Sequence, residues 1–548
     1  MNHALRLAPV FSLAVAAAAQ LPAPTLIPRT TPRAAWSAVT SAGTTSGVTT
    51  SPPTVNGTFR ADNPGAVGLN KLWVFGGCLG NNTVYTANDL WAFDPTVGTL
   101  TQVIADGAAG SPSHRGRCAI AWNPTNNKLT VFGGNTRGGS TGTGTATLLG
   151  DTWEYDPITN AWANVTPAGA SPSPRELAAM AYDPATGGLL LFGGQTSLVA
   201  PVGFSNETWL WLGGTWNQLT PATTPPGRGQ HSLATRTDSF NDVVMVGGLD
   251  NASAAPDQIR HLDVWRWTGG DWALLSDCNV VANPTGAGTT WPASTIGCQA
   301  VYDPLRSRLV VQGGNGITVA ANTVYVYGPN YAGSPTNYTS EFDSITNTWS
   351  IYANPTTGTT PYSNTDPAIG RISRYAAGFI PSAGKIYKAC GQDPTKSGSK
   401  PTNNVYAYQA TPVAAATTYG TGCAGSVAPL TLTANNLPWT GRTFACTASG
   451  FGPLSLGLGI LGVAQSAIPL AALLPQGGLG CDLLNTADAI VTLVPAAGQA
   501  QLTLPVAAST ALAGATLNFQ AAELQFDPSL NWVGLFSSNG IAITVGAL

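Results

Sequence analysis

Few side chains in this sequence could carry catalytic chemistry. Only four histidines occur in 548 residues. No Cys-x-x-Cys pair is present to hold zinc, and there is neither a Gly-x-Ser-x-Gly nucleophile elbow nor a phosphate-binding glycine loop. A glycosidase that uses two carboxylates stays open, because any two of the 26 acidic side chains could converge in the fold.

Four arginines and one histidine are the candidate ligand-binding residues. Arg117, Arg175, Arg228 and Arg374 each begin a short segment of mostly apolar residues, and His231 follows Arg228 closely. A guanidinium group binds carboxylates and sugars well. The same arginines could instead bond backbone carbonyls at strand ends, and His231 could bond the backbone of a neighbouring segment. The sequence leaves both interpretations open.

These candidates sit in a repeated sequence pattern. A short apolar run and a Gly-Gly doublet precede a segment rich in Trp or Tyr, and the pattern returns six times, the last in decayed form. The residue before the doublet is Phe in the first three copies. A recurrence at roughly 50 residues or more indicates repeats that must stack to bury their apolar faces, as four-stranded blades do in a ring. The patterns end at Gly77, Gly134, Gly194, Gly248, Gly314 and Gly391.

The repeat from Arg175 to Thr220 shows why four strands are expected. The first segment runs into an Asp-Pro-Ala-Thr-Gly-Gly turn. Leu189 to Phe192 is a continuous apolar run, which is typical of a strand covered on both faces. Two Trp-containing segments then flank Gly213 and Gly214, and a two-residue Gly-Gly connection is a strong hairpin signal.

These motifs resemble the kelch family in its secreted, galactose-oxidase-like branch, over residues 34–412. Arg-Gly-Gln-His-Ser, from Arg228 to Ser232, is the best match to the family's strand-opening motif. The resemblance implies a six-bladed kelch-type β-propeller with the candidate arginines near its central channel. It also invites a copper site built from Tyr, His and Cys. The sequence has no Tyr-His dipeptide, and so we expect no metal, no cofactor and no oxidase activity.

The last blade is expected to close with a strand from the other end of the chain. The sixth repeat has a third strand, 404–408, but no Trp-containing fourth strand after it. Residues 35–40 read Ala-Trp-Ser-Ala-Val-Thr and match 161–166, Ala-Trp-Ala-Asn-Val-Thr, almost residue for residue. A lone edge strand is the alternative. Closure would remove the exposed edge of the sheet.

The first 19 residues predict export. A positive start, a short apolar stretch and Ala17-Ala18-Ala19 are typical of a cleaved signal peptide, residues 1–19. Charged residues make up 9% and the net charge is −3, which disfavours a nucleic-acid partner. The apolar stretch 454–474 is broken by Gly and Pro, so we expect strands there and no membrane span. The protein is expected at the cell surface or outside the cell, whether extracellular or periplasmic, as a monomer.

Eight cysteines in an exported chain favour disulfides. Three pairings are expected, and they leave Cys390 and Cys446 over. The pairs are Cys278 with Cys298, Cys78 with Cys118, and Cys423 with Cys481.

The sequence after residue 412 changes character. Residues 411–418 read as a linker, and 419–548 hold short alternating apolar segments separated by turns, which predict a β-sandwich. Tyr-Gly-Thr-Gly-Cys-Ala-Gly, 419–425, resembles a C-terminal domain of secreted bacterial proteins.

Two functions are consistent with these residues. The first is a secreted binding or surface-scaffold protein that holds a glycan or a protein on its blade loops and channel mouth. The second is a secreted propeller enzyme, either a carbohydrate oxidase or a glycosidase. The absence of a copper motif favours the binding protein.

Overall fold

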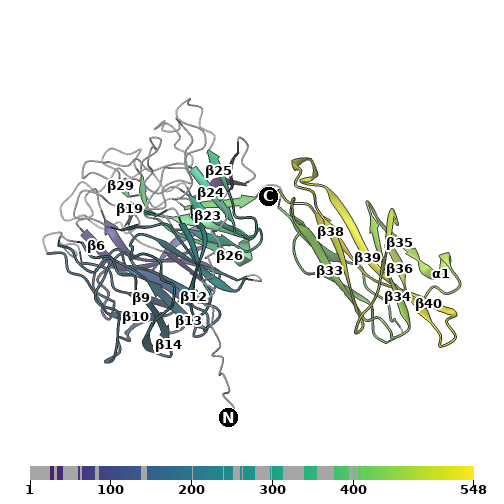
Figure 1. Cartoon of the computed structure of the whole chain (residues 1–548), viewed down its shortest axis with the longest axis horizontal. Coiled ribbons are helices and arrows are strands. Elements are labelled where there is room, and N and C mark those ends of the chain that lie inside the picture. Colours follow the sequence, from purple (N-terminus) through teal and green to yellow (C-terminus); the bar gives the residue numbers. More distant parts are fainter. Residues whose placement is uncertain are drawn as a thin grey trace, which may run out of the picture.

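The computed structural model is all-β, apart from one short α-helix and short 3-10 turns in the part that it describes. Figure 1 shows two bodies, which we call the repeat region (described residues between 25 and 410) and the C-terminal region (413–547). The structure describes residues 25–29, 34–40, 60–61, 65–79, 85–136, 145–199, 202–237, 240–250, 259–261, 263–277, 297, 299–312, 338–353, 375–393, 400–401, 405–410, 413–425 and 427–547.

Six sheets make up the described part of the repeat region, each with four successive antiparallel strands from inside to outside. Sheet one holds β4 (Gly65–Gly68), β5 (Lys71–Leu79), β6 (Tyr85–Asp94) and β7 (Thr99–Ile104), with β3 (Arg60–Ala61) beside β5. Sheet two holds β8 (Ala119–Asn123), β9 (Lys128–Phe132), β10 (Thr152–Asp156) and β11 (Ala161–Asn164). Sheet three holds β12 (Ala179–Asp183), β13 (Gly188–Phe192), β14 (Thr208–Leu212) and β15 (Thr215–Leu219).

The other three sheets continue the pattern. Sheet four holds β16 (Ser232–Arg236), β17 (Asp242–Val246), β20 (Asp263–Trp267) and β21 (Trp272–Asp277). Sheet five holds β22 (Val301–Asp303), β23 (Arg308–Gln312), β24 (Tyr338–Asp343) and β25 (Thr348–Ala353). Sheet six holds β26 (Ala376–Ile380), β27 (Lys385–Ala389), β30 (Val405–Ala410) and β2 (Ala34–Thr40). Two small hairpins, β18 (Leu249–Asp250) with β19 (Ile259–Arg260) and β28 (Gln392–Asp393) with β29 (Lys400–Pro401), lie beside them.

The innermost strands contact one another in a ring. β4 contacts β8, and the contacts continue through β12, β16, β22 and β26 back to β4. Gln299, just before β22, joins the first strand of sheet one to the first strand of sheet six. Its amide donates to the Gly65 carbonyl over 2.7 Å, and its oxygen accepts from the backbone N–H groups of Gly65 and Ala377 at 3.0 and 2.8 Å.

A repeated aromatic contact packs each outer strand against the preceding sheet. The Phe before a Gly-Gly doublet lies beside the fourth-strand Trp of the next sheet, and the ring centroids are 4.9–5.2 Å apart. Such pairs add to the free energy gained by burial alone. These Trp residues therefore pack between neighbouring sheets. The pairs are Phe75 with Trp162, Phe132 with Trp216, and Phe192 with Trp272.

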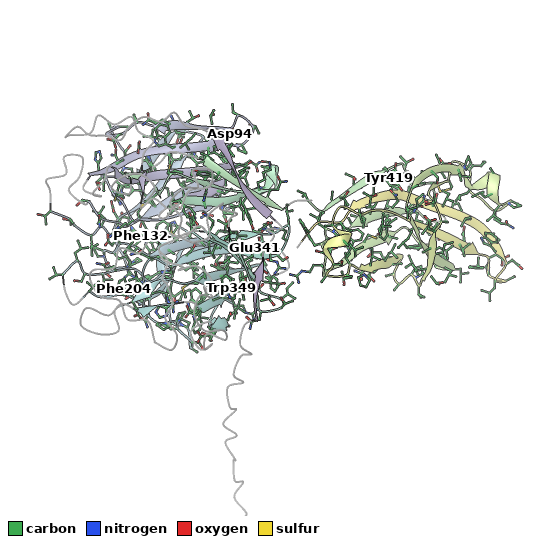
Figure 2. The ribbon with its side chains drawn as sticks, turned by 90° about the horizontal axis from the view of Figure 1, so that it is seen from above. Asp94, Phe132, Phe204, Glu341, Trp349 and Tyr419 are labelled. Atoms are coloured by element: carbon green, nitrogen blue, oxygen red, sulfur yellow. A yellow bond between two sulfur atoms is a disulfide. The ribbon has the colours of Figure 1, made fainter. Side chains whose placement is uncertain are left out.

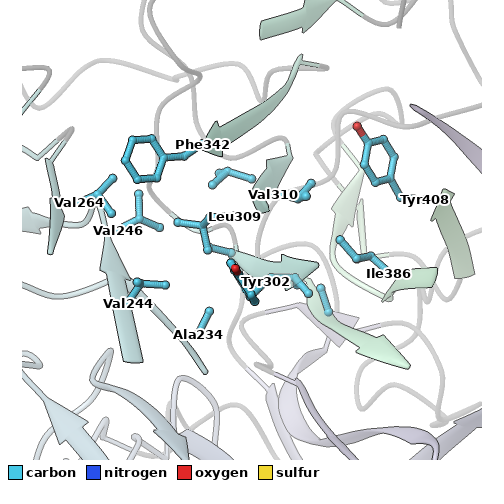
Figure 3. Packing of buried hydrophobic residues seen from close by; sticks show 14 of the residues in the cluster. Ala234, Val244, Val246, Val264, Tyr302, Leu309, Val310, Phe342, Ile386 and Tyr408 are labelled. Carbon is cyan, nitrogen blue, oxygen red and sulfur yellow. The ribbon is translucent and has the colours of Figure 1, made fainter. Parts of the chain in front are cut away.

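The largest buried cluster joins sheets four, five and six. Figure 3 shows Val246 and Val264 of sheet four beside Phe342 and Leu309 of sheet five, with Ile386 of sheet six further along. Valine and aromatic side chains suit strands that are covered on both faces. Sheets four, five and six therefore share one continuous core.

The N-terminal strand pairs where the sequence predicted. β2 runs antiparallel to β30, with Ala34 opposite Ala410 and Trp36 opposite Tyr408. A further strand, β1 (Thr25–Arg29), was not expected. It pairs with β25 in parallel, with Thr25 opposite Thr348. A parallel partner distant in sequence needs no adjacent turn, so β1 carried no local signal.

The C-terminal region contains two main sheets around one buried cluster. One sheet has the order β31 (Ala415–Tyr419), β40 (Trp532–Thr544), β39 (Thr516–Phe526), β34 (Ser455–Gly462) and β37 (Ala489–Leu493). The other has the order β32 (Thr431–Ala434), β33 (Thr443–Ser449) and β38 (Gln499–Pro505). Phe444 of the smaller sheet and Phe519 of the larger one meet with ring centroids 5.3 Å apart. β35 (Gln465–Pro469), α1 (Leu470–Leu473) and β36 (Asp482–Asn485) lie outside this pair.

The stretch 454–474 therefore forms strands for most of its length, as expected. Of the residues described, none belongs to a helix with the length and hydropathy that a membrane crossing needs.

The expected cysteine pairs have three different outcomes. Cys423 and Cys481 form a disulfide, with Cα atoms 5.1 Å apart. The expected bond between Cys78 and Cys118 is wrong. Cys118 is a buried thiol that packs with Phe75 and Ile120, and burial raises its pKa to about 11. Cys278 and Cys298 lie outside the described residues, so their bond stays a prediction.

The two regions meet at sheet five. Trp439 packs into the core cluster of the repeat region and donates its indole N–H to the Leu305 carbonyl. Arg442 lies 2.8 Å from Asp343, which also pairs with Arg308. Figure 2 shows Glu341, two residues before Asp343, on the side of the repeat region that faces the C-terminal region.

Replacing residues 34–40 with a Gly-Ser segment of equal length should lower the melting temperature by several degrees. The substitution removes β2 and leaves β30 as an exposed edge, since the ladder between these strands completes sheet six. Calorimetry of the mature protein measures the effect. A matched Gly-Ser replacement of 137–143 is the control, and equal melting temperatures for wild type and the 34–40 variant would contradict closure by β2.

Candidate functional site

The Gly-Gly doublets mark one end of the ring, which we call the doublet face. In sheets one to three the doublet lies near the end of the second strand or directly after it, and its second glycine donates to the carbonyl of an arginine in the next sheet. Gly77 donates to Arg115, Gly134 to Arg175 and Gly194 to Arg228, over 2.8–2.9 Å.

The first glycine of each doublet has no room for a side chain. A Cβ built on Gly193 would lie 2.5 Å from the carbonyl oxygen of Arg228, and φ at Gly193 is +69°. Only glycine accepts both the close approach and the positive φ without strain. The doublets are therefore the points where successive sheets lock together.

Arg228 is held by a set of contacts to a doublet carbonyl and to an acid that also binds a Trp. We call this set the clamp. The Nη1 of Arg228 donates to the Gly247 carbonyl at 3.0 Å, and its two Nη atoms hold both oxygens of Asp263, at 2.6 and 3.0 Å. The indole N–H of Trp265 donates to the same carboxylate at 2.7 Å. Burial opposes the ionisation of Asp263, but Arg228 outweighs it, and the pKa of Asp263 is lowered.

The same clamp occurs in sheets two and three. In both, an arginine bonds a doublet carbonyl and the acid that precedes the third-strand Trp. The arginine side chains are fully buried. The two sets are Arg115, Gly133, Asp151 and Trp153, and Arg175, Gly193, Glu207 and Trp209.

The structure thus places Arg175 and Arg228 in contacts within the fold, which is the second of the two interpretations that the sequence left open. Every described partner of their guanidinium groups belongs to the fold. Arg228 holds Asp263 through both Nη atoms, whereas Arg175 contacts Glu207 through Nη2 alone and bonds Ser173 and Gly193 with its other donors. Arg115 is the third member of the set, and it was not among the expected residues. Ser111-Pro-Ser-His-Arg115 matches Ser171-Pro-Ser-Pro-Arg175, a signal that would have identified it.

His231 is also part of the fold. It is 6% exposed and its ring stands edge-on to Phe192 of the preceding sheet, with centroids 5.5 Å apart. Burial, with Arg228 nearby, lowers the pKa of His231 to about 3. The imidazole is therefore neutral at physiological pH, and its packing agrees with the structural role that the sequence left open beside the ligand-binding one.

Arg117 remains the candidate that faces the inner end of the sheets. It pairs with Glu176 of sheet three at 3.2 Å, and the second oxygen of Glu176 accepts from the Asn135 amide. Arg117, Leu177 and Gln230 occupy one position in three successive sheets, each with a left-handed φ of +55° to +61°. Leu177 donates to Arg117 and Gln230 donates to Leu177, over 2.9 and 3.0 Å. Non-glycine residues in this conformation often mark functional sites.

Glu176 and Asn135 were not among the expected residues. Asn135 follows a doublet and is fully buried, and its side-chain oxygen has no partner among the described residues. Their only sequence signal was their place in the repeat. Arg374 lies outside the described residues, so its role stays a prediction.

His261 lies on the same face, beside the sheet-four clamp. Its Nε2 is 2.9 Å from Asp250 and its Nδ1 is 4.0 Å from Asp263. It thereby links the β18–β19 hairpin to the clamp. The described residues include no group of three or more His, Cys, Asp or Glu side chains placed to hold a metal ion.

The lengths of the connections differ between the two ends of the ring. On the doublet face, β13 ends at Phe192 and β14 begins at Thr208, and β23 ends at Gln312 while β24 begins at Tyr338. At the other end, which we call the turn face, only Gly213 and Gly214 separate β14 from β15. Turns of up to five residues join the other strand pairs there, with four residues between β8 and β9 and five between β16 and β17. Long connections on a rigid scaffold are where binding residues concentrate.

Arg228→Met should destabilise the repeat region by roughly 3–5 kcal/mol, because it leaves the Asp263 carboxylate buried without its partner. Urea unfolding measures the loss. Lys71→Met, at a surface pair with Asp94, is the matched control and should cost about 1 kcal/mol or less. A loss for Arg228→Met no larger than that control would contradict the clamp.

His231→Phe should flatten the pH dependence of stability. The folded-state pKa of His231 lies near 3 and the unfolded value near 6.5, so the unfolded chain takes up the proton first as pH falls. Between pH 7 and pH 5, His231 should therefore cost the wild type about 2 kcal/mol of unfolding free energy. Urea titrations at both pH values give the difference, and His114→Gln is the control. Equal losses in wild type and His231→Phe would overturn this assignment.

A comparison with known families agrees with this geometry. The model of the KLHDC2/KLHL20/DRC7 Kelch-repeats domain matches residues 64–275, from the start of β4 to the fourth strand of sheet four. Residues 64–275 thus carry kelch repeats, and with the all-β sheets they fit a kelch-type β-propeller.

Proposed function

We propose that this protein is a secreted binding or surface-scaffold protein that holds an extracellular protein on its doublet face. In this proposal the six sheets are the blades of a propeller that β2 closes, and the C-terminal region is a β-sandwich. Kelch repeats commonly mediate protein binding, and the match over 64–275 supports that role here.

The difference between the two faces carries the proposal. The described strands of the turn face are joined tightly, while the long connections all leave from the doublet face. Arg117 and Glu176 lie at the inner end of that face, where three sheets meet. The leader at 1–19 and the Cys423–Cys481 disulfide support export, since disulfides persist in oxidising compartments.

Photo-crosslinking can test which face binds. A crosslinking amino acid at Val199, which is 75% exposed on the doublet face, should capture a partner from an extracellular protein fraction of the source cells. The same group at Ile158, 89% exposed on the turn face, is the matched control and should capture nothing above background.

The captured partner then needs a quantitative test. Arg117→Ala should weaken its binding by at least about tenfold, since it breaks the pair with Glu176, while Ile158→Ser should leave affinity unchanged. A glycan array run in parallel tests the other ligand class. Glycan binding that Arg117→Ala abolishes would replace the protein partner, and capture at Ile158 alone would refute the doublet face as the binding surface.

A further inference from the structure

The end of the C-terminal region furthest from the repeat region exposes a group of aliphatic side chains. Figure 1 places α1 and the start of β40 at this end. We call it the distal tip. Leu479 is 93% exposed and Leu530 is 73% exposed, which is far above the usual exposure of leucine in a folded domain. The other exposed members are Leu473, Leu474 and Val533.

Two loops form the distal tip, and they are bonded to each other. Leu535, at the start of β40, donates to the Gln476 carbonyl and accepts from Gly478, both over 2.9 Å. The disulfide from Cys481 to Cys423 holds the first loop two residues after Leu479. The leucines are therefore presented by a fixed framework.

Three backbone N–H groups of the distal tip donate to carbonyls within it. Leu474 donates to Leu470, Gly477 donates to Leu474, and Leu530 donates to Asp527, over 2.9–3.0 Å. An unpaired backbone group is costly in an apolar medium. These loops can therefore enter such a medium without losing hydrogen bonds to water at these positions.

The charged side chains of the C-terminal region indicate whether the distal tip suits an anionic or an uncharged lipid surface. Residues 411–548 contain five charged side chains, and Arg442 is the only basic one. Arg442 is bound to Asp343 at the opposite end of the region. The distal tip thus offers no cation to an anionic surface. Trp532 lies beside Leu530, half buried, with its N–H bonded to Gly534, and amphipathic rings of this kind favour a lipid–water boundary.

We infer that the distal tip attaches the protein to the surface of an uncharged lipid layer, with Leu479 and Leu530 entering the acyl region. Asp527 argues against a second copy as the occupant. Its carboxylate accepts from Ser529 and Asn531 at the base of the Leu530 loop and stays in water. Two copies packed tip to tip would bring two such carboxylates together, whereas at a lipid surface each keeps its water.

Vesicle sedimentation of the mature full-length protein tests the inference. The protein should sediment with phosphatidylcholine vesicles, and neither added phosphatidylglycerol nor high salt should change the bound fraction by more than about twofold. Leu479→Ser with Leu530→Ser should weaken binding by at least about tenfold. The matched control is Val97→Ser with Ile158→Ser, equally exposed aliphatic residues of the turn face, and it should bind as the wild type does. Melting temperatures of both variants should match the wild type.

Three results would overturn the inference. The wild type could fail to sediment with phosphatidylcholine, or its binding could require phosphatidylglycerol and disappear at high salt. It could also form a lipid-free dimer that the Leu479 and Leu530 changes abolish, which would assign the distal tip to self-association. The assay needs no ligand of the doublet face, so its outcome does not depend on the proposed binding function.

Discussion

The close approach between the Gly-Gly doublets of sheets one to three and the arginine of the next sheet is the constraint on which the packing of the first four sheets depends. A Cβ at the first glycine would collide with that arginine's carbonyl oxygen, so the doublet must be glycine. The arginine side chain then returns to the carbonyl of its own sheet's doublet and to the acid before the third-strand Trp. One set of contacts thus joins two neighbouring sheets and three strands within one of them.

This constraint also determines which side chains are left for function. A buried guanidinium paired with a carboxylate is costly to expose, since it would lose its partner. Arg175 and Arg228 are therefore committed to the fold, and so is the neutral His231 beside Phe192. In the proposed function, recognition therefore falls to the long connections of the doublet face and to positions such as Arg117, two residues beyond the clamp. The scaffold is stiff at the level of the clamp, and this gives the connections a fixed base.

The C-terminal region contacts the repeat region on the turn face, at sheet five. Trp439 and Arg442 hold the C-terminal region against Leu305 and Asp343, both in or beside turns of sheet five on the turn face. The doublet face is left uncovered by this contact. The distal tip lies at the other end of the C-terminal region, so a molecule attached there would keep its doublet face available to a partner.

The sequence by itself determined the repeats, their strand order and the closure of sheet six. These features have local signals, because a Gly-Gly doublet, a two-residue hairpin connection or a Trp-containing strand is legible in a short window. The pairing of residues 35–40 with 404–408 was legible because the N-terminal segment copies a strand that recurs elsewhere. The Cys423–Cys481 bond was found in the same way, from matching Gly-Cys contexts.

Tertiary structure alone decided the roles of individual side chains. Arg115 and Arg117 are two residues apart, yet one is buried in a clamp and the other pairs with Glu176 at the inner end of the sheets. Cys118 packs as an apolar side chain, although the sequence predicted a disulfide with Cys78. β1 and the contact between Trp439 and Leu305 join segments far apart in the chain. Whether a side chain is buried, and which groups it contacts, depends on which segments of the chain pack together. A local sequence pattern does not contain that information.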